Sequence, residues 1–249
     1  MSGHSKWAKI KHAKGAADAK RGAAFTKVTR EITAAAKDGG GDPNINIRLR
    51  AAIARAKGIN MPMTNVENAI KKGTGELPGI VYEAVTFDAY GPGGVALLIE
   101  GLTDNKNRTT AEVRNILSKK NGSLAGAGST AWMFDTKGLI SIDKGKVSED
   151  KLMEIVLDAG ADDINGEGDS FEVTCEPANL EKVKEALKKG NIAISTAEIT
   201  KVPKSTVKVI GADAKNVLAL MEALEEHEDI QNVHANFDIP DEELEKAAG

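Results

Sequence analysis

Cationic side chains crowd the first part of the chain, and their types point to one kind of chemistry. Residues 1–30 contain eight Lys or Arg and a single acid, Asp18. Lys and Arg neutralise phosphates and release bound counterions, and Trp7 among them could stack on an exposed base. The pattern predicts binding to a polyanion, with nucleic acid as the first candidate.

The charge is divided unevenly along the chain. Residues 1–72 hold fifteen basic and five acidic residues, so residues 73–249 keep 18 of the 33 basic and 32 of the 37 acidic residues. A basic region followed by an acidic one indicates that one end of the molecule meets the polyanion. A charge run is usually a solvated helical face, but thirteen Lys or Arg against four acids in residues 1–57 favour binding.

The candidate nucleic-acid contacts are the cations of this region together with one aromatic and one imidazole side chain. They are Lys6, Trp7, Lys9, Lys11, His12, Lys14, Lys20, Arg21, Lys27, Arg30, Arg48, Arg50, Arg55 and Lys57. His4 and His12 have no Cys or carboxylate at ligand spacing, which argues against a metal.

Catalytic signatures are missing from the rest of the sequence. The stretch AGAGST (residues 125–130) lacks the Gly-Lys-Ser/Thr ending of a phosphate loop, and no Gly-x-Ser-x-Gly elbow or Cys-x-x-Cys pair occurs. His227 and His234 are interpreted as isolated, and Cys175 as a core residue. A loop with Lys106 and Arg108 at a helix start could hold an anion or be a plain polar loop. We expect no enzyme activity, catalytic residue, metal or cofactor.

The composition indicates the cellular compartment of the protein. One cysteine excludes an intramolecular disulfide framework and suits a reducing compartment. No stretch approaches the roughly 18 apolar residues of a membrane span, and the start does not have the pattern of a secretory signal. We therefore expect a cytoplasmic protein that does not bind a membrane.

Three short helices are predicted around the cations. Phe25, Val28 and Ile32 share one stripe of a helix over residues 16–37. Asp42 is the expected N-cap of a second helix over 43–57. A capping-box spacing starts a third helix at Thr64, and Gly73 is its expected stop.

The acidic part of the chain, residues 73–249, is predicted to form two α/β units. A hairpin over residues 80–102 precedes a helix with a capping box from Thr109 to Glu112 and a strand over 129–134. From residue 139 the order β-α-β-β-α-β follows, which is the ferredoxin-like arrangement, and a last β-α-β ends near residue 237. Because β-α-β alone is too small for a core, we expect it to complete the unit begun at residue 80, although contiguous halves are the simpler alternative.

The predicted fold class is therefore α+β, with an N-terminal three-helix domain, a discontinuous α/β domain and an inserted ferredoxin-like βαββαβ domain. The expected bounds are 1–75 for the helical domain, 80–134 plus 204–240 for the discontinuous domain, and 135–203 for the insertion.

Several long runs resemble the YebC family of transcription and translation regulators. They are GHSKWAKIKHAK, DAKRGAAFTKVTREI, GGGDPN, RLRAAI, NMPMTNVENAIKKGTGE, AYGPGGVALLIEGLTDNKNRTTAEVR and GSTAWMF. The resemblance implies three domains with an inserted ferredoxin-like one, and a cytoplasmic regulator of gene expression. Some members are described as DNA-binding, and others as acting on the ribosome at difficult sequences such as consecutive prolines.

The sequence leaves three functional hypotheses open. The first is a regulator on duplex DNA, and the second is a factor on ribosomal RNA and the ribosome, which a basic segment with one stacking aromatic suits somewhat better. The third is a protein-interaction module whose acidic domains bind a basic partner.

Overall fold

The computed structural model describes residues 18–166, 168–240 and 243, and these form two compact units. One comprises residues 18–129 with 215–233, and the other comprises residues 130–214 with 234–240 and 243. Both combine helices with β-sheets, so the predicted α+β class is confirmed. None of the described helices combines the length and the apolar character that crossing a membrane requires.

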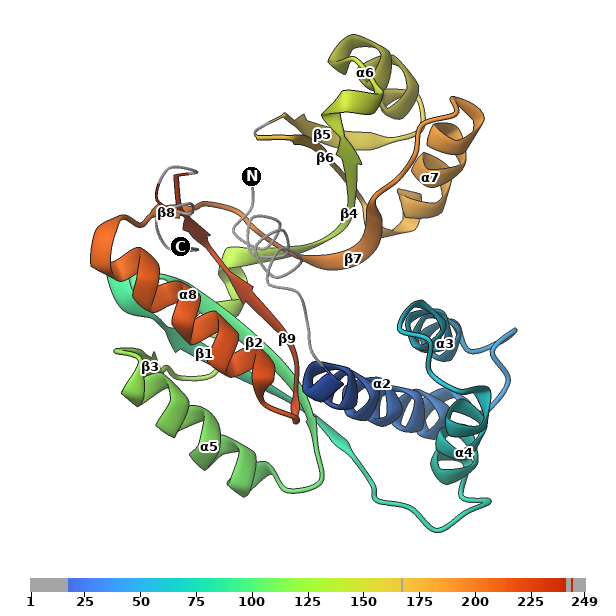
Figure 1. The fold of residues 1–249 in the computed structure, drawn as a ribbon, viewed down its shortest axis with the longest axis vertical. Coiled ribbons are helices and arrows are strands. Elements are labelled where there is room, and N and C mark those ends of the chain that lie inside the picture. The colour runs from blue at the N-terminus through green and yellow to red at the C-terminus, as the bar shows by residue number, and fades with distance from the viewer. Residues whose placement is uncertain (1–17, 167, 241–242, 244–249) are drawn as a thin grey trace. The chain divides into compact units, whose positions relative to one another are not determined.

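Three helices form the N-terminal part of the first unit, as predicted (Figure 1). They are α2 (Asp18–Gly39), α3 (Ile47–Gly58) and α4 (Met63–Thr74). Ile32, Leu49 and Val66 are almost completely buried between them, and alanines fill the remaining core. Small side chains let helices approach closely. At the crossing of α2 and α4, a Cβ added to Gly73 would lie 2.4 Å from the Thr33 carbonyl oxygen.

The predicted helix ends need correction. Asn46, and not Asp42, is the N-cap of α3, because the Asp42 side chain accepts from Asn44 N at 2.8 Å and forms a turn ahead of the helix. No side chain caps α4, whose N-cap residue is Pro62, so the predicted capping box is absent. The helix passes through Gly73 and ends before Gly75, which adopts a left-handed conformation at φ 84°.

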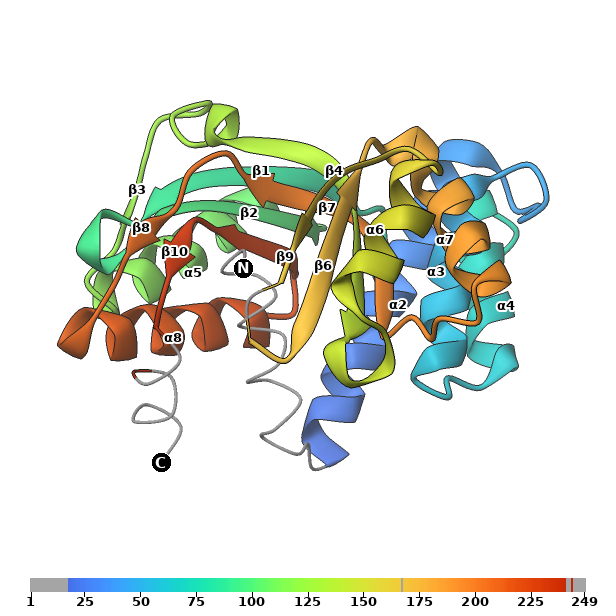
Figure 2. The ribbon, with the colours of Figure 1, turned by 90° about the horizontal axis from the view of Figure 1, so that it is seen from above.

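A four-stranded sheet with strand order β3-β1-β2-β9 forms the centre of the first unit. Its strands are β1 (Glu83–Tyr90), β2 (Ala96–Thr103), β3 (Ser123–Leu124) and β9 (Ile230–Ala235). β1 and β2 form the predicted antiparallel hairpin. Helices α5 (Lys106–Lys119) and α8 (Gly211–Glu226) lie on one face of the sheet (Figures 1 and 2).

Helix α5 begins earlier than the sequence suggested. Its N-cap is Asn105, whose side chain accepts from Arg108 N at 3.1 Å. Thr109 therefore lies inside the helix and is buried, so the capping box predicted from Thr109 to Glu112 is wrong. From this position inside the helix, the Thr109 hydroxyl donates to Asp229 Oδ2 at 2.6 Å.

The second unit contains the predicted ferredoxin-like βαββαβ arrangement. Its elements are β4 (Phe134–Asp143), α6 (Glu149–Leu157), β5 (Ala161–Asn165), β6 (Ser170–Cys175), α7 (Leu180–Lys189) and β7 (Thr196–Pro203). The antiparallel sheet has the order β5-β6-β4-β7, and α6 and α7 cover one face (Figure 1). Cys175 is buried in this core, as expected.

A short parallel pair completes the second unit. It joins β8 (Val207–Lys208) to β10 (Phe237–Asp238). The division of the chain into three domains at the bounds predicted above stays a proposal.

Candidate nucleic-acid interface

The structure describes only part of the predicted cation set. Lys6, Trp7, Lys9, Lys11, His12 and Lys14 lie outside the described residues. Lys20 and Arg21 belong to the start of α2, where only the backbone course is described. The described side chains are those of Lys27, Arg30, Arg48, Arg50, Arg55 and Lys57, and they fall into three groups.

The two cations of α2 face residues 225–229. Lys27 Nζ donates to the Glu225 carbonyl oxygen at 2.5 Å. The Arg30 guanidinium pairs with both Asp229 and Glu228 and lies 5.5 Å from the centre of the Tyr82 ring. These contacts stay within the first unit, so the α2 cations are already engaged by groups of the chain itself.

One side of α3 carries cations that are tied to α2. Arg48 Nη1 lies 2.7 Å from Asp38 Oδ2, and Arg55 Nη2 lies 2.6 Å from Glu31 Oε1. The two arginines are seven residues apart and therefore share a stripe of the helix. Burial raises the pKa of Glu31, and the nearby charges of Arg55 and Arg48 partly offset that rise. This stripe holds α3 against α2.

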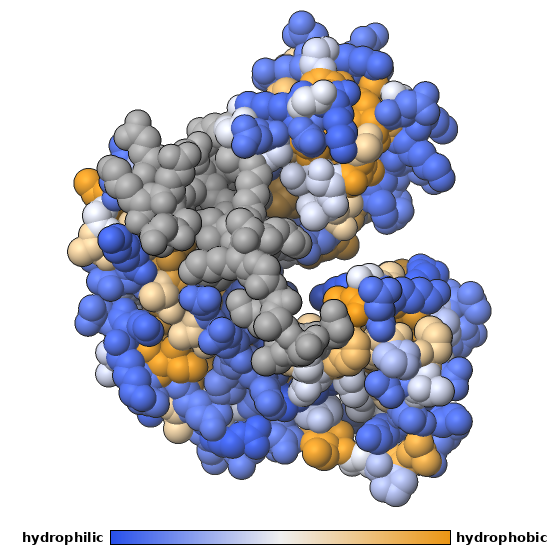
Figure 3. All heavy atoms as spheres, viewed as in Figure 1, coloured by the Kyte–Doolittle hydropathy of each residue, from blue (hydrophilic) through white to orange (hydrophobic). Residues whose placement is uncertain are grey.

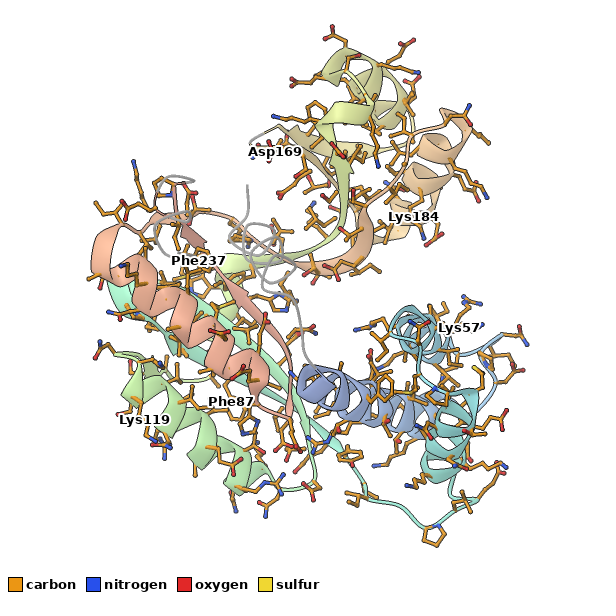
Figure 4. The ribbon with its side chains drawn as sticks, in the orientation of Figure 1. Lys57, Phe87, Lys119, Asp169, Lys184 and Phe237 are labelled. Atoms are coloured by element: carbon orange, nitrogen blue, oxygen red, sulfur yellow. The ribbon has the colours of Figure 1, made fainter. Side chains whose placement is uncertain are left out.

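The other side of α3 carries cations that are left to solvent. Arg50 and Lys57 are also seven residues apart, and both are exposed. The Arg50 guanidinium reaches only the Asn44 carbonyl oxygen at 3.4 Å, and the Lys57 ammonium group makes no hydrogen bond or ion pair with a described residue. Figure 4 shows Lys57 on α3.

Further exposed cations follow in the last turn of α4, namely Lys71 and Lys72. The surface over the three helices is mainly hydrophilic, with a few apolar patches between polar side chains (Figure 3). Helix α3 contains no acidic residue, so Arg50 and Lys57 have no carboxylate on their own helix to pair with.

Sequence reasoning missed a second polar cluster, which is centred on Asp229. Asp229 Oδ2 accepts from Thr109 Oγ1 at 2.6 Å, from Arg108 Nη2 at 2.9 Å and from Thr103 Oγ1 at 3.2 Å, and Oδ1 pairs with Arg30. Burial alone would raise the pKa of Asp229. The hydrogen bonds from Thr109 and Arg108, with the charges of Arg30 and Arg108, outweigh burial and lower that pKa to about 2.

His227 belongs to the same cluster, so its predicted isolation is wrong. Its Nδ1 accepts from Asp229 N at 3.1 Å, and its Nε2 lies 2.9 Å from Glu112 Oε2. Because Nδ1 is the acceptor, Nε2 carries the proton and donates to Glu112. Ligand atoms of Glu112, His227 and Asp229 lie within 4.8 Å of one another.

These three residues do not form a metal site as they stand. Arg108 Nη2 lies 2.9 Å from Asp229 and its Nε lies 3.9 Å from Glu112, so a guanidinium already occupies the space between the carboxylates. Hydrogen bonds to Asp229 and Asp104 raise the pKa of Arg108 further above its usual value. Engaged in this way, Arg108 does not present the free cation that an anion-binding loop would need.

An open pocket of about 550 Å³ lies at this cluster, with Arg30, Tyr82, Arg108, Glu112 and His227 among its lining residues. Five carboxylates line this pocket, those of Asp104, Glu112, Glu226, Glu228 and Asp229, and they outnumber its two arginines, so the wall is acidic overall. No local sequence signal marks Asp229, since its partners come from α2, β2 and α5.

Comparison with known proteins relates the whole chain to one group. Residues 5–76 match the family model described as the TACO1/YebC protein N-terminal domain, and residues 82–237 match the TACO1/YebC second and third domain. The chain is 56% identical to a probable transcriptional regulatory protein of Geobacter sulfurreducens, over 99% of each chain. It is 55% identical to a probable transcriptional regulatory protein of Dictyoglomus thermophilum, over 98% of this chain and 99% of the relative.

A solved structure supports the same relationship. The crystal structure of a conserved hypothetical protein from Aquifex aeolicus matches with a TM-score of 0.78 at 44% sequence identity. The match covers 90% of this chain and 93% of that one.

Proposed function

The chain belongs to the TACO1/YebC family of regulatory proteins, and we propose that it is a non-enzymatic, nucleic-acid-binding regulator of gene expression that works in the cytoplasm. The exposed cation stripe of α3 carries the proposal. Arg50 and Lys57 are solvated, α3 has no acid, and Lys71 and Lys72 add charge nearby in the sequence.

The proposed mechanism is electrostatic docking. Phosphates of the nucleic acid bind the exposed cations and displace counterions, while the acidic residues of the remaining chain are repelled and orient the molecule. The N-terminal candidates, among them Lys6, Lys9 and Lys11, add further phosphate contacts. Trp7 stacks on an exposed base.

Two targets fit this mechanism, namely duplex DNA and ribosomal RNA on the ribosome. The names of the curated relatives favour a role in transcription. A ribosome-acting factor that eases consecutive prolines is the alternative within the same mechanism. The rival from another class is a protein-interaction module, in which the acidic domains bind a basic partner.

A salt titration tests the electrostatic mechanism. We expect the double variant Arg50→Gln with Lys57→Gln to bind a DNA duplex and a ribosomal RNA fragment less tightly. The slope of log K against log salt concentration should become shallower by the equivalent of about two phosphate contacts. The matched control is Lys182→Gln with Lys189→Gln, an exposed pair with the same spacing on α7.

The controls separate the hypotheses. An unchanged slope in the α3 variant, or an equal loss in the α7 variant, would favour the interaction module. Co-sedimentation with ribosomes beside a duplex gel shift, both at physiological salt, distinguishes the two targets. Retention on ribosomes with only non-specific duplex binding would exclude the transcription version.

A further inference from the structure

Two isoleucines project into solvent beside the α3 cation stripe. Ile45 is 79% exposed and Ile47 is 71% exposed, and they have the highest exposed fractions among the large apolar side chains of the described residues. Isoleucine gains about 1.5–3 kcal/mol from full burial, so exposing two of them at one tip is costly. An exposed apolar tip of this kind often marks a contact surface.

The chain holds this tip in place with a buried amide. Asn46, between the two isoleucines, donates from Nδ2 to the Ala35 and Gly40 carbonyl oxygens, at 2.8 Å each. Its Oδ1 accepts from Leu49 N at 3.0 Å. Asp42 Oδ1 accepts from Asn44 N just before it. The tip is therefore preorganised, and the outward direction of Ile45 and Ile47 follows from the inward direction of Asn46.

The neighbouring surface fits a polyanion at close range. On the helix, Ile47 lies on the same side as Arg50, Ala54 and Lys57, opposite the buried stripe. Ala54 is small and exposed, so a ligand can approach the helix backbone between the two cations. Because this face carries cations, charge complementarity favours a nucleic acid as its ligand over an apolar protein surface that has no acidic residues.

We propose that Ile45 and Ile47 form an apolar wedge that packs against unstacked bases of a nucleic acid whose phosphates lie on Arg50 and Lys57. The wedge rests on the proposed function and deepens it, because it names bases, and not the backbone alone, as a contact. Apolar side chains inserted at base steps partly unstack them, and the loss of stacking is offset by the new contacts.

Base unstacking can be measured directly. Probes are a DNA duplex and an RNA hairpin, each carrying 2-aminopurine, whose fluorescence rises when its neighbours unstack. We expect the wild-type chain to raise the fluorescence of one probe. The double variant Ile45→Ser with Ile47→Ser should bind that probe about tenfold more weakly, with no rise in fluorescence and an unchanged salt slope.

The matched control is Ile199→Ser with Ile210→Ser, two isoleucines of similar exposure in the other unit, at 57% and 61%. This pair should leave affinity and fluorescence unchanged. Thermal unfolding of each variant checks that the fold is intact, which exposed positions should preserve.

The two proposals fail in different ways. Full affinity and full fluorescence in the Ile45 and Ile47 variant, with a reduced salt slope in the Arg50 and Lys57 variant, would overturn the wedge and leave the proposed function standing. No effect in either variant would overturn both. An equal loss in the Ile199 and Ile210 control would also overturn the wedge.

Discussion

Arg30 and Asp229 form an ion pair across 199 positions of the sequence, and both side chains are almost shielded from solvent, with exposed fractions of 11% and 3%. The pair joins α2 to the segment between α8 and β9. Thr103 and Thr109 bring β2 and α5 to the same carboxylate. One side chain therefore ties together four parts of the first unit.

Loss of the Asp229 charge should destabilise the protein. Asp229→Asn takes from the largely buried Arg30 guanidinium its buried carboxylate partner and leaves it only the exposed Glu228. Removing one member of a buried pair costs about 3–5 kcal/mol of unfolding free energy. Urea denaturation measures the change. Arg108 pairs with both Asp229 and the exposed Asp104, so Asp104→Asn is the control. It should cost less than about 1 kcal/mol. Equal costs would contradict a central role for Asp229.

Acid should weaken the same cluster. The pKa of Asp229 is about 2 in the folded chain and near 3.8 when unfolded. A lowered folded pKa stabilises the fold above the unfolded value, and this contribution is lost as the pH falls from about 4 towards 2. We expect it to amount to about 2 kcal/mol.

The Asp229→Asn variant is the reference for that measurement. The pKa of Glu31 is raised in the folded chain, so its effect on stability at acid pH has the opposite sign to that of Asp229. Measurements on the wild type alone would combine the two effects. The difference between wild type and variant isolates Asp229. If their stabilities fall in parallel from pH 4 to pH 2, the assignment to Asp229 is wrong.

Substitutions in the two stripes of α3 should affect different properties, with the stripe paired to α2 affecting stability and the exposed stripe affecting binding. Arg55→Gln leaves the buried Glu31 carboxylate without its partner at 2.6 Å, which should cost about 1–3 kcal/mol. Arg50→Gln should change stability by less than about 0.5 kcal/mol, because Arg50 lies on the surface. Chemical denaturation of the two variants tests the order, and a larger cost for Arg50→Gln would reverse our assignment.

Gly73 should be intolerant of a methyl group. Ala is favoured over Gly inside a helix by about 1 kcal/mol, yet a Cβ here would lie 2.4 Å from the Thr33 carbonyl oxygen. We expect Gly73→Ala to destabilise the helical region by about 1–3 kcal/mol. Gly58→Ala is the control, because nothing lies within 4 Å of its Cβ, and it should be neutral or stabilising. Thermal unfolding compares them, and a stabilised Gly73→Ala would disprove the close crossing.

Local patterns account for most of the correct fold predictions. The stripe of Phe25, Val28 and Ile32 predicted α2, and alternating strands with two amphipathic helices predicted the βαββαβ unit. Helix starts were less accurate. Asp42, Thr64 and Thr109 are all good capping residues, but each helix begins one to four residues away from the predicted start. Asn46 caps α3, Asn105 caps α5, and no side chain caps α4.

By itself, the sequence determined most helices and strands, the family and the concentration of cations in the first part of the chain. These depend on residue type and short spacing, which a linear pattern contains. The strand predicted over residues 129–134 is wrong, because residues 131–133 form a short 3-10 helix and β4 begins only at Phe134. Only the tertiary structure decided which cations are available. It places Arg30, Arg48 and Arg55 against acids and leaves Arg50 and Lys57 in solvent.

The Asp229 cluster likewise came only from the fold. An ion pair requires two groups to meet within about 4 Å, and residues such as Arg30 and Asp229 meet only after helices and strands have packed. Charge can be counted along a chain, whereas its neutralisation depends on distances in space.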